Sequence, residues 1–178
     1  MTDVTRRSIT TGAAWSLPAI TVAAAAPSSA ASNLPAPSIN RSFYITRSSS
    51  GVLTVQSNND GVSYYQVVNA TSKTTLTNVM ASVLVNVPGL QFTRSTTNWS
   101  PVTQDSQTYV YNGITYYRYF STLAVPVPAP VNGTVTIPRL NWTSVASPAL
   151  TSSVSVNGRG TITIDGKQQT QIGVFRTV

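Results

Sequence analysis

Few side chains in this sequence are suited to acid–base or nucleophilic chemistry. The chain contains no His and no Cys, and its four acidic residues are all Asp. One lies near the N-terminus, and the others are Asp60, Asp105 and Asp165. The usual general bases, the Cys nucleophile and nearly all transition-metal ligands are therefore missing, and a Ser-His-Asp triad cannot be assembled.

The remaining ionisable residues are poorly placed for catalysis. A glycosidase needs two carboxyls that face one bond, but Asp60 and Asp165 each precede a Gly in a predicted turn, where Asp has a structural role. Lys73 and Lys167 would have to be desolvated to act as bases, and both fall in turns predicted to face water. Calcium cages need several clustered carboxylates. We therefore predict a protein that is not an enzyme and that holds no metal ion and no cofactor.

Tyrosines in one predicted hairpin are the best candidates for a binding site. An alternating, strand-like pattern surrounds Asn112-Gly113, the pair preferred in a two-residue type I′ turn. The register that this turn dictates pairs Tyr109 with Tyr116 and Gln107 with Arg118. One face then carries four candidate binding residues: Tyr109, Tyr111, Tyr116 and Arg118. Exposed aromatic rings can stack on sugars or anchor a protein partner, although cross-strand pairing by itself also favours aromatics.

The formal net charge of +7 and the pI near 10.2 favour anionic partners. An anionic cell-wall polymer or an acidic polysaccharide would be attracted by such a charge. The basic residues are scattered along the chain and form neither a cluster nor a known nucleic-acid-binding module, so we predict no nucleic-acid partner. Solubility alone is the alternative explanation for the charge.

The elements that must hold these residues are strands. Residues 62–69 and a second run that stops at Pro88-Gly89 form a strand pair on which the rest of the chain is expected to pack. In the second run one face is predicted to lie on the core: Val79, Ala81, Val83, Val85 and Val87. The other face is predicted to be mostly in contact with water: Asn78, Met80, Ser82, Leu84 and Asn86.

Further strands are predicted along the chain, and no helix is predicted after residue 32. They cover residues 42–47, 52–57, 90–93, the hairpin 108–120, 134–137, and a closing meander of 150–156, 160–165 and 171–176. Asn157-Gly158 and Asp165-Gly166 supply the turns of this meander. Residues 125–130 contain alternate prolines and cannot form a central strand. About nine or ten short strands with frequent turn signals indicate an antiparallel β-sandwich.

A short segment also resembles a known group of domains. The residues Val67-Val68-Asn69, the run 75–79 (Thr-Leu-Thr-Asn-Val) and Val87-Pro88 are similar to a strand–turn–strand pattern that recurs in immunoglobulin-like repeats of bacterial surface proteins. The resemblance implies an immunoglobulin-like sandwich. Since the chain has no Cys, this sandwich must be held by core packing and strand pairing rather than by disulfides.

The first 32 residues have the three parts of an export signal. Arg6 and Arg7 are followed by a mild apolar stretch, residues 12–26, and then by small residues. The twin arginine resembles a Tat signal peptide, and the whole leader resembles those of exported actinobacterial proteins. We therefore expect a signal peptide over 1–32, a β-sandwich domain over 33–178, and a secreted or cell-surface location. The apolar stretch is too short and polar for a secure membrane span, so no stable span is expected after cleavage.

These observations favour a non-catalytic exported bacterial protein with an interaction or structural role at the cell surface or in the medium. One alternative is a carbohydrate or cell-wall binding module that uses the tyrosine hairpin. Another is a subunit of an extracellular assembly that pairs through exposed strand edges. The partners left open are an anionic cell-wall polymer, a glycan, a surface protein and a second copy of the chain.

Overall fold

The computed structural model describes residues 35–145, 150 and 152–178, so the predicted signal peptide, residues 1–32, lies outside the described residues. The described residues form strands and no helix. The strands are β1 (Ser38–Ser42), β2 (Tyr44–Arg47), β3 (Leu53–Ser57), β4 (Tyr64–Val68), β5 (Leu76–Val85), β6 (Phe92–Arg94), β7 (Thr103–Tyr111), β8 (Ile114–Thr122), β9 (Thr134–Thr136), β10 (Leu140–Ser144), β11 (Ser155–Ile164), β12 (Lys167–Ile172) and β13 (Arg176–Thr177). Over this part of the chain, no helix long and apolar enough to cross a membrane is found.

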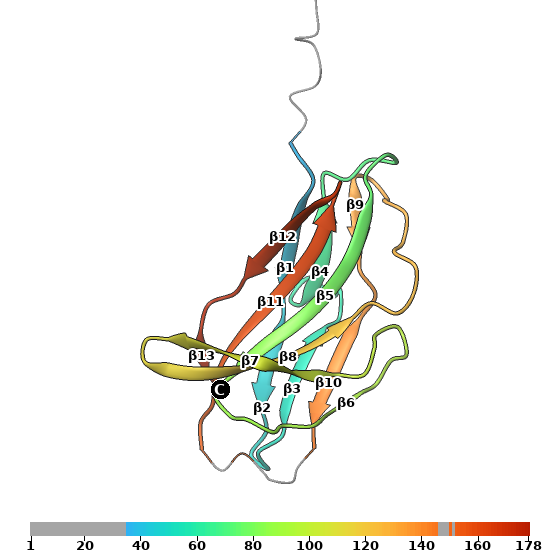
Figure 1. Ribbon diagram of the computed structural model, residues 1–178. Helices are drawn as coiled ribbons and strands as arrows, with labels where there is room; N and C mark the ends of the chain where they lie inside the picture. The colour runs from blue at the N-terminus through green and yellow to red at the C-terminus, as the bar shows by residue number, and fades with distance from the viewer. Residues whose placement is uncertain (1–34, 146–149, 151) are drawn as a thin grey trace, which may run out of the picture. The chain divides into compact units, whose positions relative to one another are not determined.

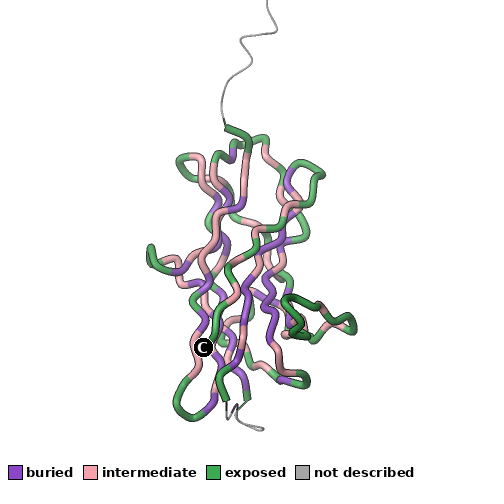
Figure 2. The backbone as a smooth tube through the Cα atoms, turned by 90° about the vertical axis from the view of Figure 1, so that its left-hand side faces the viewer, coloured by how far each residue is buried: buried purple, intermediate pink, exposed green. Residues whose placement is uncertain are grey.

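The strands pack as two layers, and every strand pair is antiparallel (Figure 1). The first layer contains two short sheets, with strand orders β1-β4-β9 and β2-β3-β10-β6. The second layer has the order β12-β11-β5-β8-β7, and β13 pairs with β11 beside this path. Buried positions lie mainly along the middle of the sandwich, and exposed positions gather in its loops and projecting segments (Figure 2), as expected when two sheets enclose one core.

The two short sheets of the first layer behave as one long sheet with a break in the middle. Strand β1 continues into β2 through Phe43 alone, and β9 continues into β10 across residues 137–139. Two hydrogen bonds span the break: the Ile137 amide donates to Tyr65 O at 2.9 Å, and Asn59 Nδ2 donates to Ile137 O at 3.1 Å. The break explains why the structure has more strands than the nine or ten predicted.

The strand order is that of an immunoglobulin-like β-sandwich. In that fold strands A, B, E and D form one sheet and strands G, F and C form the other. Here β2-β3-β10-β6 matches the first sheet, and β12-β11-β5 matches the second. The β7–β8 hairpin is added beside β5, at the position that extra strands occupy in variable-type domains. The predicted fold class is therefore confirmed.

Tyr65 joins the two layers at the centre of the sandwich. Its side chain is fully buried, and its hydroxyl donates to two carbonyls of the opposite layer, Met80 O at 3.0 Å and Thr161 O at 2.9 Å. Its ring stacks on Trp99, with a centroid distance of 6.3 Å and an interplanar angle of 16°. Burial raises the pKa of Tyr65, so the hydroxyl stays protonated and remains a donor.

A glycine makes room for this contact. A Cβ on Gly160 of β11 would lie 2.8 Å from Cε2 of the Tyr65 ring, closer than real Cβ contacts allow. Gly160 therefore lets the ring approach the backbone of the opposite layer. In antibody domains a disulfide joins strands B and F. Here β3, which corresponds to strand B, is followed in the same layer by β4, and a tyrosine of β4 and a glycine of β11 join the two layers instead.

Two sequence predictions about strand connections are wrong. Strands β4 and β5, expected to form a pair, lie in opposite layers, because β4 pairs with β1 and β9 while β5 pairs with β8 and β11. Asn157-Gly158 is not a turn but lies inside the long strand β11. A Cβ on Gly158 would be 3.1 Å from Phe43 and 3.2 Å from Ile45, so this glycine serves close packing between the layers.

The alternation predicted for residues 78–87 is only half right. Val79, Ala81, Val83 and Val85 are buried in the core, as predicted. On the other face Ser82 and Leu84 were expected to contact water, but Ser82 is 2% exposed and Leu84 is 0% exposed. A second set of side chains therefore covers this outer face of β5.

Removal of the Tyr65 hydroxyl tests its role between the layers. We expect Tyr65→Phe to lower the free energy of unfolding by about 1–3 kcal/mol, because two buried carbonyls lose their shared donor. Urea unfolding measured by tryptophan fluorescence would report the change. The matched control is Tyr64→Phe, a half-buried neighbour on the opposite face of β4, which should change stability by less than about 0.5 kcal/mol. Equal losses in both variants would contradict a specific role for the Tyr65 hydroxyl.

Candidate binding face

The predicted hairpin is present, with its tip at Asn112-Gly113. Both tip residues have positive φ, 49° and 74°, as a type I′ turn requires. Tyr109 pairs with Tyr116, as predicted. Beyond Thr108 the register shifts, so the predicted pairing of Gln107 with Arg118 is wrong. The bulge between Gln104 and Thr108 instead brings Asp105 to Arg118, and the two form an ion pair.

Two of the predicted tyrosines contact Phe175 of the C-terminal segment. Phe175 stacks on Tyr111, with ring centroids 4.2 Å apart and an interplanar angle of 7°, and its ring also lies 4.8 Å from that of Tyr116. Tyr116 is only 1% exposed, and its hydroxyl shares a 2.8 Å hydrogen bond with Ser155 Oγ. Leu84 is buried on the same outer face, outside the main core. Tyr116 therefore belongs to a small second core and is not free to stack on a ligand, whereas Tyr111 is 48% exposed and keeps part of its surface in contact with solvent.

The other two predicted residues form part of an arginine–tyrosine stack. The guanidinium carbon of Arg118 lies 5.8 Å from the centroid of the Tyr109 ring, and that of Arg159 lies 5.4 Å from the same centroid. Arg118 also lies 5.3 Å from the ring centroid of Phe120. All of these residues are partly exposed. Two cations held against one aromatic ring create a positive, partly aromatic surface on the outer face of the second layer.

Hydrogen bonds orient the two arginines of this stack. Arg159 Nε donates to Asn157 Oδ1 at 3.0 Å, while Arg118 Nη2 donates to a carboxylate oxygen of Asp105. Among the described residues, neither terminal nitrogen of Arg159 has a hydrogen-bond partner. Burial lowers the pKa of Arg159; Tyr109 acts in the opposite direction and the charge of Arg118 in the same direction. Arginine has so high an ordinary pKa that Arg159 remains charged at neutral pH.

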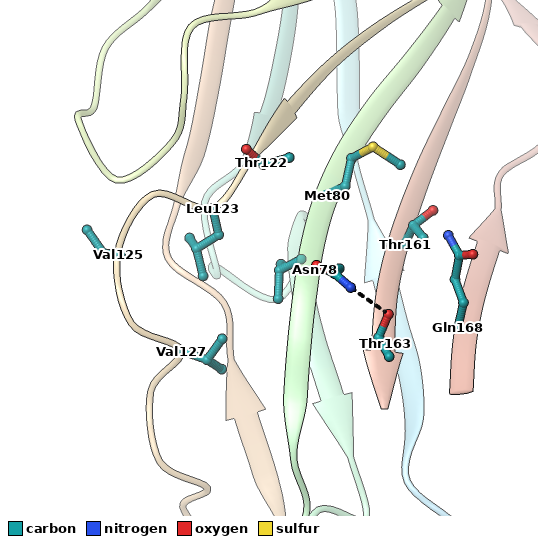
Figure 3. A pocket seen from close by; sticks show the side chains of 10 residues that line it. Asn78, Met80, Thr122, Leu123, Val125, Val127, Thr161, Thr163 and Gln168 are labelled. Carbon is teal, nitrogen blue, oxygen red and sulfur yellow. Dashed lines mark hydrogen bonds between the residues drawn. The ribbon is translucent and has the colours of Figure 1, made fainter. Parts of the chain in front are cut away.

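A groove lies on the outer face of the second layer (Figure 3). It has a volume of about 580 Å³, and strands β5, β11 and β12 line it together with residues 122–127. Asn78 adopts φ +50° at a bulge in β5, and its Nδ2 donates to Thr163 Oγ1 at 3.3 Å. None of the residues that line the groove is charged or aromatic. The groove therefore lacks the groups that would recognise an anion or a sugar ring.

The carboxylates of the described residues serve local structure. Asp60 Oδ1 accepts hydrogen bonds from the amides of Val62, at 3.0 Å, and Ser63, at 2.8 Å, in the predicted turn. Asp165 Oδ1 accepts one from the Thr75 amide at 2.8 Å. Within residues 35–145, 150 and 152–178, no three acidic side chains come together in a way that could hold a metal ion. That the protein is not an enzyme remains a prediction.

Two residues of this face were missed by sequence reasoning. Arg159 follows Gly158 in what was predicted to be a turn, and only the continuous β11 strand brings it beside the hairpin. Phe175 was assigned to the last strand of a meander, whereas it lies between β12 and β13. A single Phe between two short strand-like runs near the C-terminus was only a weak sign that this side chain packs against another part of the chain. The partner it covers is more than fifty residues away in sequence, which local patterns do not reveal.

Comparisons with known proteins do not place the chain in a family. No protein-family model and no curated protein matches it. Solved structures similar to the chain include the GAE domain of GGA2p from Saccharomyces cerevisiae, at 15% sequence identity and a TM-score of 0.35, with 80% of this chain and 97% of that chain covered. The fold assignment therefore depends on the strand order, and the function on the binding face.

Neutralisation of Asp105 tests the ion pair that orients Arg118. The Gln107 amide, 3.2 Å away, and the Arg118 charge hold the pKa of Asp105 below its ordinary value. The stabilisation is complete above the unfolded Asp pKa of about 3.9 and is lost as pH falls through the folded value. We expect Asp105→Asn to reduce stability by about 0.5–1 kcal/mol at neutral pH, a small effect because water screens this pair, and to have no effect at strongly acidic pH. A pH-independent loss measured by urea unfolding would contradict this assignment.

Proposed function

We propose that the protein is a non-catalytic, exported bacterial domain that binds an anionic glycan or wall polymer through the outer face of its second layer. The observation that carries this proposal is the arginine–tyrosine stack formed by Arg118, Tyr109 and Arg159. Guanidinium groups bind carboxylate and phosphate oxygens in a fork geometry. An adjacent tyrosine ring offers a surface for the apolar face of a sugar.

The charge balance of this face supports an anionic ligand. Asp105 compensates one arginine, whereas Arg159 is oriented by the neutral side chain of Asn157 and keeps its full positive charge. Residues 33–178 contain nine basic and three acidic side chains, and the resulting net charge of +6 adds long-range attraction for a polyanion. A twin-arginine leader, Arg6-Arg7, would deliver the domain to the outside of the cell, where anionic wall polymers are abundant.

The position of the stack on a rigid sheet also supports binding. Tyr109, Arg118 and Arg159 come from three strands of one sheet, β7, β8 and β11. Their side chains are therefore held by paired backbone rather than by flexible loops, which reduces the conformational entropy lost when a ligand binds. Tyr111 and Tyr116 both contact Phe175 and so hold the hairpin against the C-terminal segment, which supports the stack. Tyr116 is buried and does not contact the ligand.

Retention on purified Gram-positive cell walls tests the proposed function. We expect the chain to bind at low salt and to be released at high salt, since surface charge interactions are screened. Arg159→Gln and Tyr109→Ala should each reduce the bound fraction several-fold. The matched controls are Arg139→Gln and Tyr44→Ala, an exposed arginine and an exposed tyrosine outside the stack. If the controls lose as much binding as the stack variants, net charge alone explains retention, and the proposed face is wrong.

The export step can be tested separately. We expect the double substitution Arg6→Lys and Arg7→Lys to leave the protein in the cytoplasm of a host that has a twin-arginine pathway. Cell fractionation followed by immunoblotting would measure this. The matched control is Arg139→Lys, outside the leader, which should be exported normally. Unchanged export of the double variant would contradict a twin-arginine leader.

A further inference from the structure

A second cationic site lies at one side of the sandwich, where β2 of the first layer meets the end of β12. A cavity of about 270 Å³ is lined there by residues from both layers, among them Arg41, Phe43, Gln171, Gly173 and Arg176. Two arginines thus line a single cavity. None of the three residues of the arginine–tyrosine stack, Tyr109, Arg118 and Arg159, lines it.

The guanidinium of Arg41 is held firmly within this cavity. Its Nε donates to Gln171 O at 3.0 Å and its Nη2 donates to Gly158 O, while its guanidinium carbon lies 5.0 Å from the centroid of the Phe43 ring. A Cβ on Gly173 would lie only 2.8 Å from Nη2, so a glycine is needed at that position to seat the group. Among the described residues, Nη1 of Arg41 donates to none.

Arg176 supplies the second positive charge. It begins the short strand β13, and its Nη2 donates to Ile45 O at 2.8 Å. In the described part of the chain the one ion pair is that of Arg118 with Asp105, so neither cavity arginine is neutralised by a carboxylate. Burial is the main cause that lowers the pKa of Arg41, to about 10, as expected for a desolvated cation without a counter-ion.

A neutral acceptor completes the set of groups. Gln171 also lines the cavity, and its Oε1 is buried without a hydrogen-bond partner among the described residues. An unpaired buried acceptor is costly, and a donor from a ligand would relieve that cost. The cavity therefore offers guanidinium donors for anionic oxygens and one amide oxygen for a hydroxyl group.

We infer that this cavity binds an oxyanion that also carries a hydroxyl donor, the chemistry shared by monobasic phosphate and by hydroxycarboxylates such as uronic acids. Arg41 and Arg176 bind the anionic oxygens, and the hydroxyl group donates to Gln171 Oε1. The volume of about 270 Å³ suits one such group rather than a whole oligosaccharide. The inference goes beyond the wall-binding face and stands on different residues.

NMR titration of the full-length ¹⁵N-labelled protein tests the site. At constant ionic strength and slightly acidic pH, phosphate and glucuronate are each compared with sulfate and acetate, which lack the hydroxyl donor. We expect saturable shifts of the Gly158 and Gly173 amides and of Arg41 Nε–H with phosphate, glucuronate or both; whichever saturates identifies the source of the oxyanion. Equal affinity for sulfate and phosphate, with no binding of glucuronate, would contradict the role of Gln171.

Two variants link the shifts to the cavity. Arg176→Gln should weaken phosphate or glucuronate binding by about tenfold or more, because a charge-assisted hydrogen bond is lost. The matched control, Arg139→Gln, removes the same charge elsewhere and should leave the affinity unchanged. Gln171→Glu places a carboxylate beside Arg41, keeps the side-chain shape and should abolish anion binding in a folded protein. Absence of saturable shifts, or equal affinity in all three variants, would overturn the site.

Discussion

The structure depends on the contact between Tyr65 of one layer and Gly160 of the other. The chain has no Cys, so no disulfide can join the strands that correspond to B and F of an immunoglobulin domain. The tyrosine hydroxyl reaches the backbone carbonyls of Met80 and Thr161 only because Gly160 has no side chain. Trp99 stacks on the ring and Phe43 packs nearly perpendicular to it, so burial of one large aromatic replaces a covalent cross-link at the centre.

This central contact also shapes the outer face of the second layer. Met80 and Thr161 pair beside the bulge that Asn78 makes with φ +50°. The Tyr65 hydroxyl binds these two carbonyls from the core side and so holds β5 and β11 in place. The bulge lies in β5, and both strands line the groove of Figure 3. A bulge increases the local twist of a strand. The same two strands, β5 and β11, continue to Leu84 and Arg159, so core packing and the binding face share one frame.

Local sequence patterns predicted the strands and the hairpin but not how they are connected in space. Alternation located the core face of β5, and Asn112-Gly113 fixed the hairpin register near its tip, because both signals act between neighbours. Three other features depend on residues that are distant in sequence. They are the layer to which β4 belongs, the continuity of β11 through Gly158, and the contact by which Phe175 covers Tyr116. Two predicted binding residues, Tyr109 and Arg118, lie in the exposed stack, whereas Tyr116 became part of a second core.

The arginines of this domain are oriented mainly by neutral groups, and this follows from the absence of Glu. Arg41 and Arg176 donate to backbone carbonyls, and Arg159 donates to Asn157. Such partners fix the position of a guanidinium and leave its charge intact. A carboxylate would fix the position and also neutralise the charge. Asn157 also donates through Nδ2 to Gly173 O, so one neutral side chain connects the arginine–tyrosine stack to the glycine that seats Arg41. A sandwich built in this way keeps its positive field available to ligands while its cations remain rigidly placed.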